Sequence, residues 1–158
     1  TGLHQRVWLD WMTLLPLHPH ATVKVGGTAA AIFSAQNNFS DFFLLGAPEP
    51  VTSRSLVFQG LEANELIVQV ALLGRLGYQQ FFTRNLNLAL DVNAGFLAFP
   101  EVGTQATPRP ETFVGGIGLT LGYRTIAGPV RFSLMQPIGL GEIVTSHLRT
   151  FLSFGYQF

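Results

Sequence analysis

Charged residues are scarce in this sequence. Of its 158 residues only 11% are charged, nine basic and nine acidic, whereas 47% are apolar. A soluble globular domain usually carries about 25% charged residues, so this composition leaves little with which to cover a surface that faces water. The formal net charge of zero supplies no overall field that would attract nucleic acid. We therefore expect no nucleic-acid partner.

Cysteine is absent altogether. Its absence excludes disulfide-stapled scaffolds and thiolate metal sites, and it is compatible with an oxidising compartment. The sequence starts at Thr1 without the basic and apolar segments of an export signal. We therefore expect a mature or truncated product from which any such signal is missing.

Long apolar runs are missing as well, although a membrane-spanning helix needs about 20 mostly apolar residues in a row. The two most apolar stretches, 66–76 and 113–123, are interrupted by polar residues or by several glycines. Glycine costs about 1 kcal/mol per residue in a helix. A helical membrane span is therefore excluded.

Apolar residues instead recur at every second position, a spacing that indicates β-strands with one apolar face. The clearest segment is 86–98, where Leu90 and Val92 alternate with Asp91 and Asn93. Similar alternation occurs at 3–11, 22–33, 65–79, 113–124, 130–135 and 147–158. About seven strands are predicted. The segment 65–79 is interpreted as one strand whose apolar face carries Leu66, Val68, Val70 and Leu72.

No charged residue occupies an apolar position of a predicted strand. Each one lies at one of the alternate, polar positions or in a proposed turn or loop. A lipid-facing Arg or Lys at mid-membrane costs about 2–4 kcal/mol, so a membrane barrel should show this avoidance. In a soluble sandwich or lipocalin-like barrel the non-apolar face would be rich in Lys and Glu. Here it carries mainly Gly, Asn, Gln and Thr, which favours a transmembrane β-barrel with a polar lumen.

The connections between the predicted strands alternate in length. Short ones lie near 16–20, 82–84 and 125–129, and long ones near 34–61, 100–111 and 136–144. Bacterial outer-membrane barrels keep short periplasmic turns opposite longer extracellular loops. We therefore expect an outer-membrane location with the C-terminus on the periplasmic side. Because a sheet in lipid must close and single-chain barrels have even strand counts, the remaining strands are expected from upstream sequence, another chain or further copies.

Five segments taken in order carry a family resemblance. They are 42–46 (FFLLG), 58–61 (FQGL), the Gly-rich 114–124, 128–132 (GPVRF) and 152–158 (LSFGYQF). Together they resemble the C-terminal half of the barrel in the bacterial surface-antigen superfamily of barrel-assembly and translocation proteins, most closely the version attached to patatin-like phospholipases. The resemblance implies that 1–158 is the C-terminal part of one barrel domain of about 16 strands. It also implies that the extracellular loop at about 34–61 folds back into the lumen, with five strands after it.

The resemblance also suggests site residues. In that family a Val-Arg-Gly-Phe/Tyr motif anchors the loop in the lumen, and Gln59 stands here in place of its Arg, with Arg54 nearby as a substitute. Further residues that would line the lumen or anchor the loop are Gly60, Arg75, Asp91, Gly116, Gly118, Arg124, Arg131 and Arg149. Simple solvation of a polar lumen is the alternative role for the charged ones. Phe154, Tyr156 and Phe158 resemble the C-terminal signal used by the barrel-assembly machinery.

The chain carries no recognisable catalytic or cofactor motif. The Gly-Xaa-Ser-Xaa-Gly elbow of a hydrolase is absent, so a phospholipase domain would have to lie upstream. His18 and His20 lack a third ligand and indicate a solvated turn rather than a zinc site. The glycines at 116, 118 and 122 lack the ending of a phosphate loop and indicate close approach of a lumenal loop.

Three functions stay open at this stage. The first is a barrel of a type V-like secretion system that contacts outer-membrane lipid and anchors, translocates or gates a fused patatin-like or other domain. The second is a barrel-assembly or insertase component, which would template strands at a weak seam. The third is a simple porin. An upstream patatin domain would favour the first, upstream periplasmic repeat domains the second, and an open conducting pore the third.

Overall fold

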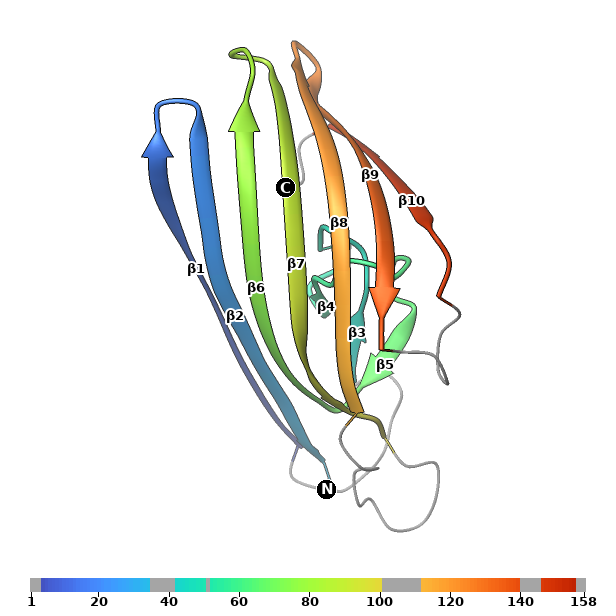
Figure 1. Ribbon diagram of the computed structural model, residues 1–158. Helices are drawn as coiled ribbons and strands as arrows, with labels where there is room; N and C mark the ends of the chain where they lie inside the picture. Colours follow the sequence, from blue (N-terminus) through green and yellow to red (C-terminus); the bar gives the residue numbers. More distant parts are fainter. Residues whose placement is uncertain (1–3, 35–41, 51, 101–111, 140–145, 156–158) are drawn as a thin grey trace.

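The computed structural model describes residues 4–34, 42–50, 52–100, 112–139 and 146–155, which form an all-β fold without helices (Figure 1). Its main unit is a seven-stranded antiparallel sheet in the order β1-β2-β6-β7-β8-β9-β10. The strands are β1 (His4–His18), β2 (Ala21–Ser34), β6 (Val70–Phe81), β7 (Leu86–Ala98), β8 (Thr112–Thr125), β9 (Gly128–Ile138) and β10 (Arg149–Phe154). The predicted set of about seven alternating strands is therefore confirmed as one sheet.

Tight turns join β1 to β2, β6 to β7 and β8 to β9 at one end of this sheet (Figure 1). In the β6–β7 turn, Thr83 Oγ1 accepts hydrogen bonds from the backbone N–H groups of Asn85 and Leu86 at 3.2 and 3.0 Å. The longer connections leave from the opposite end. The alternation of short and long connections predicted from the sequence is thus present, and five strands of the large sheet follow Gly60.

The two faces of the sheet differ in chemistry. Leu90, Phe96 and Leu119 are exposed on one face, which we call the outer face. The opposite, inner face carries polar residues and glycines together with apolar residues such as Ile32 and Leu97, and its Asn93 is buried. The segment between β2 and β6 covers part of it (Figure 1). The period-two alternation of the sequence therefore separates an exposed apolar face from a partly covered face of mixed polarity.

The covering segment, residues 42–50 and 52–69, is called the inner loop below. It contains a small sheet in which β3 (Phe43–Leu45) pairs in parallel with β4 (Ser55–Leu56) and antiparallel with β5 (Leu66–Val68). Gly46 and Gly60 adopt φ values of 144° and 96°, a region that L side chains rarely enter. These two glycines allow the chain to reverse direction inside the loop.

The prediction that residues 65–79 form one strand is wrong. The strand breaks at Gln69, because β5 leaves the large sheet to pair with β3, and β6 begins only at Val70. Val68 was assigned to the same apolar face as Leu72, yet Val68 is completely buried between the inner loop and the sheet while Leu72 is exposed on the outer face. The alternation of this segment continues through the break, so periodicity alone could not reveal that the strand changes partner.

Candidate functional site

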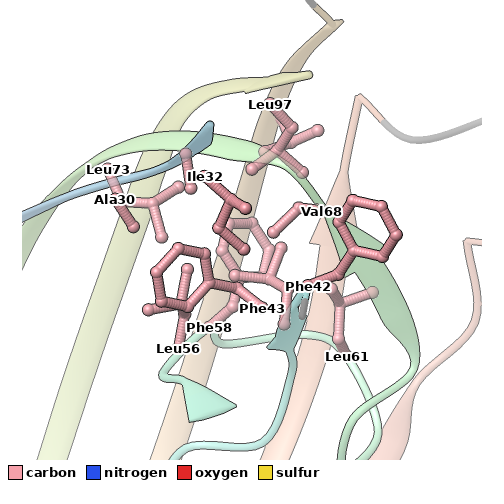
Figure 2. Packing of buried hydrophobic residues seen from close by; sticks show 13 residues of the cluster. Ala30, Ile32, Phe42, Phe43, Leu56, Phe58, Leu61, Val68, Leu73 and Leu97 are labelled. Atoms are coloured by element: carbon pink, nitrogen blue, oxygen red, sulfur yellow. The ribbon is translucent and has the colours of Figure 1, made fainter. Parts of the chain in front are cut away.

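The inner loop is attached to the sheet by an apolar cluster. Phe43, Phe58 and Leu61 of the loop are almost fully buried against sheet residues that include Ile32 and Leu97 (Figure 2). Burying a side chain of this size stabilises by about 1.5–3 kcal/mol relative to leaving it exposed. Several such residues on both partners make the inner loop a packed structural unit of the fold.

The closest approach of loop and sheet occurs at Gln59 and two glycines of β8. The Gln59 carbonyl oxygen lies where a Cβ at position 116 would be, and the Gln59 side chain lies where a Cβ at position 118 would be. Asn93 of β7 accepts a hydrogen bond from Gln59 N at 2.7 Å and donates one to Gly116 O at 3.1 Å, with its amide oriented to satisfy both. Only glycine at position 116 leaves room for the loop backbone, and glycine at position 118 leaves room for the Gln59 side chain.

Gly60 continues this contact onto β9. A Cβ added to Gly60 would lie 2.6 Å from the backbone nitrogen of Pro137. Pro137 has no N–H, so it needs no hydrogen-bond partner there. The Gly60 carbonyl oxygen faces the other way and accepts a hydrogen bond from Arg149 Nη1 at 3.1 Å. The tip of the inner loop therefore contacts β8, β9 and β10 within two residues.

Arg149, the first residue of β10, forms the most buried ion pair among the described residues. Its side chain is only 5% exposed and pairs with the carboxylate of Glu65, which is 24% exposed. Glu65 also accepts a hydrogen bond from Glu62 N at 2.7 Å. Removing the carboxylate that pairs with a buried cation leaves an uncompensated charge, which strongly destabilises the folded protein. This pair joins the end of the inner loop to the last strand of the sheet.

Two further contacts hold the loop from other directions. Arg131 on β9 pairs with Glu49 of the loop. The Arg6 guanidinium of β1 lies 5.5 Å from the centre of the Phe43 ring, within the range of a cation–π contact. The inner loop therefore contacts both edge strands, β1 and β10.

Two ion pairs lie on the inner face between strands of the sheet itself. Arg75 on β6 pairs with Asp10 on β1, and Arg75 Nη2 also donates a hydrogen bond to Thr28 Oγ1 at 3.1 Å. Lys24 on β2 and Asp91 on β7 meet at 2.6 Å across the intervening strand β6. The residue of β6 between them is Gly77, where a Cβ would collide with Asp91 Oδ1. The glycine thus makes room for an ion pair that spans three strands.

Cavities remain on the inner face beside the loop. Two of about 280 and 200 Å³ share Lys24, Asp91, Glu49, Arg131 and Gln59 in their walls. A third, of about 1160 Å³, lies between the loop and the two edges of the sheet, since residues of β1 and β10 both line it. Each is large enough for several water molecules.

The structure brings together most of the residues singled out from the sequence. Gln59, Gly60, Gly116, Gly118, Arg131 and Arg149 lie at contacts between the loop and the sheet, and Arg75 and Asp91 lie beside them on the inner face. Arg124 is exposed near the β8–β9 turn, away from these contacts. The backbone oxygen of Arg54 accepts a hydrogen bond from Leu44 N at 3.1 Å within the loop. Phe154 ends β10 and is exposed, while Tyr156 and Phe158 lie outside the described residues.

Sequence reasoning missed the partners of these residues. Glu49, Glu65, Lys24 and Asn93 were not singled out, although each contacts one of the predicted residues. The ion-pair partners lie 67 to 84 positions apart in the chain and Asn93 lies 34 positions from Gln59, so local spacing carries no signal for them. Gly77 offered a signal, because an isolated glycine in a strand often marks a close approach.

Comparison with protein-family models, with curated proteins and with solved structures finds no match. The family resemblance described above therefore remains a prediction. Within the described residues no helix is long and apolar enough to cross a membrane. The rings of His18 and His20 lie 5.9 Å apart at the β1–β2 turn, and no three His, Asp or Glu side chains of the described ranges converge on one point.

Proposed function

We propose that this chain is part of a bacterial outer-membrane β-barrel whose outer face contacts lipid and whose inner loop closes the interior. In this proposal the barrel anchors a fused or associated partner domain, of which a patatin-like phospholipase is the example that the resemblance implies. The chain itself has a structural and gating role rather than a catalytic one. The observation that carries the proposal is the chemistry of the outer face.

The outer face is apolar along whole rows of neighbouring strands. Paired residues in one such row are Leu9, Ala29, Leu72, Phe96 and Phe113, and in another Leu15, Val23, Tyr78, Leu90, Leu119 and Leu134. No charged side chain of the described residues lies on this face between the turns and the long connections. Monomeric soluble proteins rarely expose contiguous apolar patches beyond a few hundred Å². A lipid environment would satisfy such a surface without burying any charge.

The height of the apolar band also agrees with a membrane. On β7 the outer-face residues run from Leu86 to Phe96, which are ten residues apart. At about 3.3 Å per residue this distance is about 33 Å. A strand tilt of about 40° would reduce the height to about 25 Å, the thickness of the apolar band in outer-membrane barrels.

The inner loop supports a gated rather than an open interior. Its tip lies against three strands of the inner face, and its apolar cluster packs on six sheet residues at one end, Ala30, Ile32, Ala71, Leu73, Leu97 and Val114. An open porin would keep a continuous aqueous path. In the proposed barrel, passage of a partner domain or solute requires the loop to leave this position.

The lipid contact can be tested by single-cysteine labelling, which the absence of native cysteine makes straightforward. Nitroxide labels would be placed at Leu119→Cys on the outer face and at the adjacent Thr120→Cys on the inner face, in protein reconstituted into vesicles. We expect the label at 119 to be relaxed by lipid-soluble oxygen and the label at 120 by a water-soluble nickel chelate. Equal exposure of both labels to the nickel chelate would contradict the proposal.

An assembly or insertase role is the second candidate, and one observation favours it. Within the described residues the outer edges of β1 and β10 pair with no other strand, so both could accept a strand of a client protein. Acceleration of the folding of another barrel in vesicles would support this role. Dependence of a partner domain's export on the chain, without such acceleration, would support the anchoring role.

A further inference from the structure

The direction of the two edge strands limits what can complete the sheet. Every neighbouring pair from β1 to β10 is antiparallel. Five strands separate the two edges, so β1 and β10 run in the same direction. A strand placed beside β1 must be antiparallel to it, and so must one placed beside β10, if the pattern of the sheet continues. An odd number of additional strands satisfies both conditions.

Both edges need a partner if the sheet lies in lipid, as the proposed function requires. β1 is 15 residues long, and within the described residues its outer edge is unpaired. In hydrocarbon each unsatisfied backbone group costs several kcal/mol. The cavity of about 1160 Å³ is lined by Trp8 and Asp10 of β1 and by Phe151 and Phe154 of β10, so the two edges face a common space. The sheet is therefore curved towards closure but incomplete.

Copies of this chain fit this gap poorly. Copies inserted into a membrane from the same side place their short turns at the same end, so β10 of one copy would meet β1 of the next in a parallel seam. Bacterial outer-membrane barrels are antiparallel with even strand counts. An inverted copy would give antiparallel seams, but it would put the long connections of the two copies on opposite sides of the membrane.

We infer that the sheet is completed by an odd number of transmembrane strands whose sequence differs from this chain, the first of them antiparallel to β1. This inference rests on the proposed function and deepens it, because it names the partner of the edge. Seven strands plus an odd number give the even total that a closed antiparallel barrel needs.

The inner side of β1 indicates the chemistry of that first strand. Trp8, Met12 and Leu14 point to the inner side yet remain 54%, 49% and 60% exposed. Trp8 and Met12 pair across β1 and β2 with Ala30 and Gly26, which are too small to cover them, and Leu14 pairs with Lys24, which forms an ion pair with Asp91. The strand on the other side of β1 is therefore expected to present apolar residues to this inner side as well as to lipid.

Photo-crosslinking in the intact protein, as cells produce it, tests the inference. A photoreactive amino acid would replace Val7, Leu15 or, as a control, Leu90 in the middle of the sheet, and captured peptides would be identified by mass spectrometry. At Leu90 we expect capture only of β6 or β8, the strands on its two sides. At Val7 and Leu15 we expect, besides β2, one further peptide that does not belong to this chain, captured in antiparallel order. Its residue captured at Val7 should lie C-terminal to the residue captured at Leu15.

Three outcomes would overturn the inference. They are capture of β10 from a second copy, capture of a foreign peptide in parallel order, and capture of β2 alone while the Leu90 control succeeds. Each of these leaves the nitroxide result at Leu119 and Thr120 unaffected. Failure of the proposed closure is therefore distinguishable from failure of the membrane assignment.

Discussion

The ion pair between Glu65 and Arg149 offers the sharpest test of how the inner loop is held. The substitution Glu65→Gln keeps the size of the side chain and an oxygen that accepts from Glu62 N, and it removes only the charge opposite Arg149. Removing one partner of a fully buried pair costs about 3–5 kcal/mol. Since Glu65 is partly exposed and Arg149 keeps the Gly60 carbonyl, we expect about 2 kcal/mol, towards the lower end of the range for a lost charged hydrogen bond.

The population of the released loop is the quantity to measure. A loss of about 2 kcal/mol raises that population about 30-fold, because about 1.4 kcal/mol corresponds to a factor of ten. A reporter thiol at Ala30→Cys lies on the inner face of β2 beneath the apolar cluster and reacts with a soluble reagent only after the loop leaves. We expect the thiol in Glu65→Gln to react about 30-fold faster than in the parent carrying the same reporter.

The matched control is Glu62→Gln, an identical substitution at an exposed position three residues earlier in the loop. It should leave the reaction rate within about twofold, since exposed charges contribute about 1 kcal/mol or less. Adding Arg149→Met to Glu65→Gln should slow the thiol reaction again, because the uncompensated buried charge is gone. If Glu65→Gln reacts no faster than Glu62→Gln, the ion pair does not hold the loop.

Three other substitutions test different contacts. Gly116→Ala should release the inner loop and speed the Ala30→Cys reaction at least tenfold, because the new Cβ would collide with the Gln59 backbone. The control is Gly115→Ala, whose new Cβ meets its nearest atom at an ordinary 3.5 Å and should have little effect. Gly77→Ala should push the side chains of Lys24 and Asp91 apart and lower the unfolding free energy in detergent by about 1 kcal/mol, without altering the thiol rate. Leu119→Arg should make folding into vesicles less favourable by about 2–4 kcal/mol, whereas Thr120→Arg, which faces a cavity of about 200 Å³, should not. Equal effects of the two substitutions would contradict lipid contact at the outer face.

The strands could be predicted from the sequence because their signal is local. Alternation at Leu90, Asp91 and Val92 records which side of one strand is apolar, whatever lies beside it. The break at Gln69 could not be predicted in this way, because Val68 and Leu72 are both apolar and of the same parity, although Val68 is buried in the apolar cluster and Leu72 is exposed. What separates them is the long-range pairing of β5 with β3.

The candidate site was predictable in outline for the same reason. Gly116 and Gly118 share one face of a strand, and this local fact suffices to predict that something approaches that face closely. The resemblance directed attention to Gln59 and Arg54 as loop anchors. Arg149 was also among the candidates, but its partners were not predicted: it binds the Gly60 carbonyl, which lies 89 residues earlier in the chain. A pairing over that distance depends on the whole sheet, which no short pattern encodes.

The two edges of the sheet differ in how they are secured. Among the described residues β1 forms 14 residue pairs with β2, whereas β10 forms six with β9. The shorter edge strand begins at Arg149, whose side chain is bound to the inner loop through Glu65 and Gly60. Local stability follows the number of contacts that a segment makes, so β10 depends on the loop far more than β1 does. Within the proposed barrel, release of the loop would therefore loosen the very edge at which the sheet must be completed, so that opening the interior and weakening the seam follow from one event.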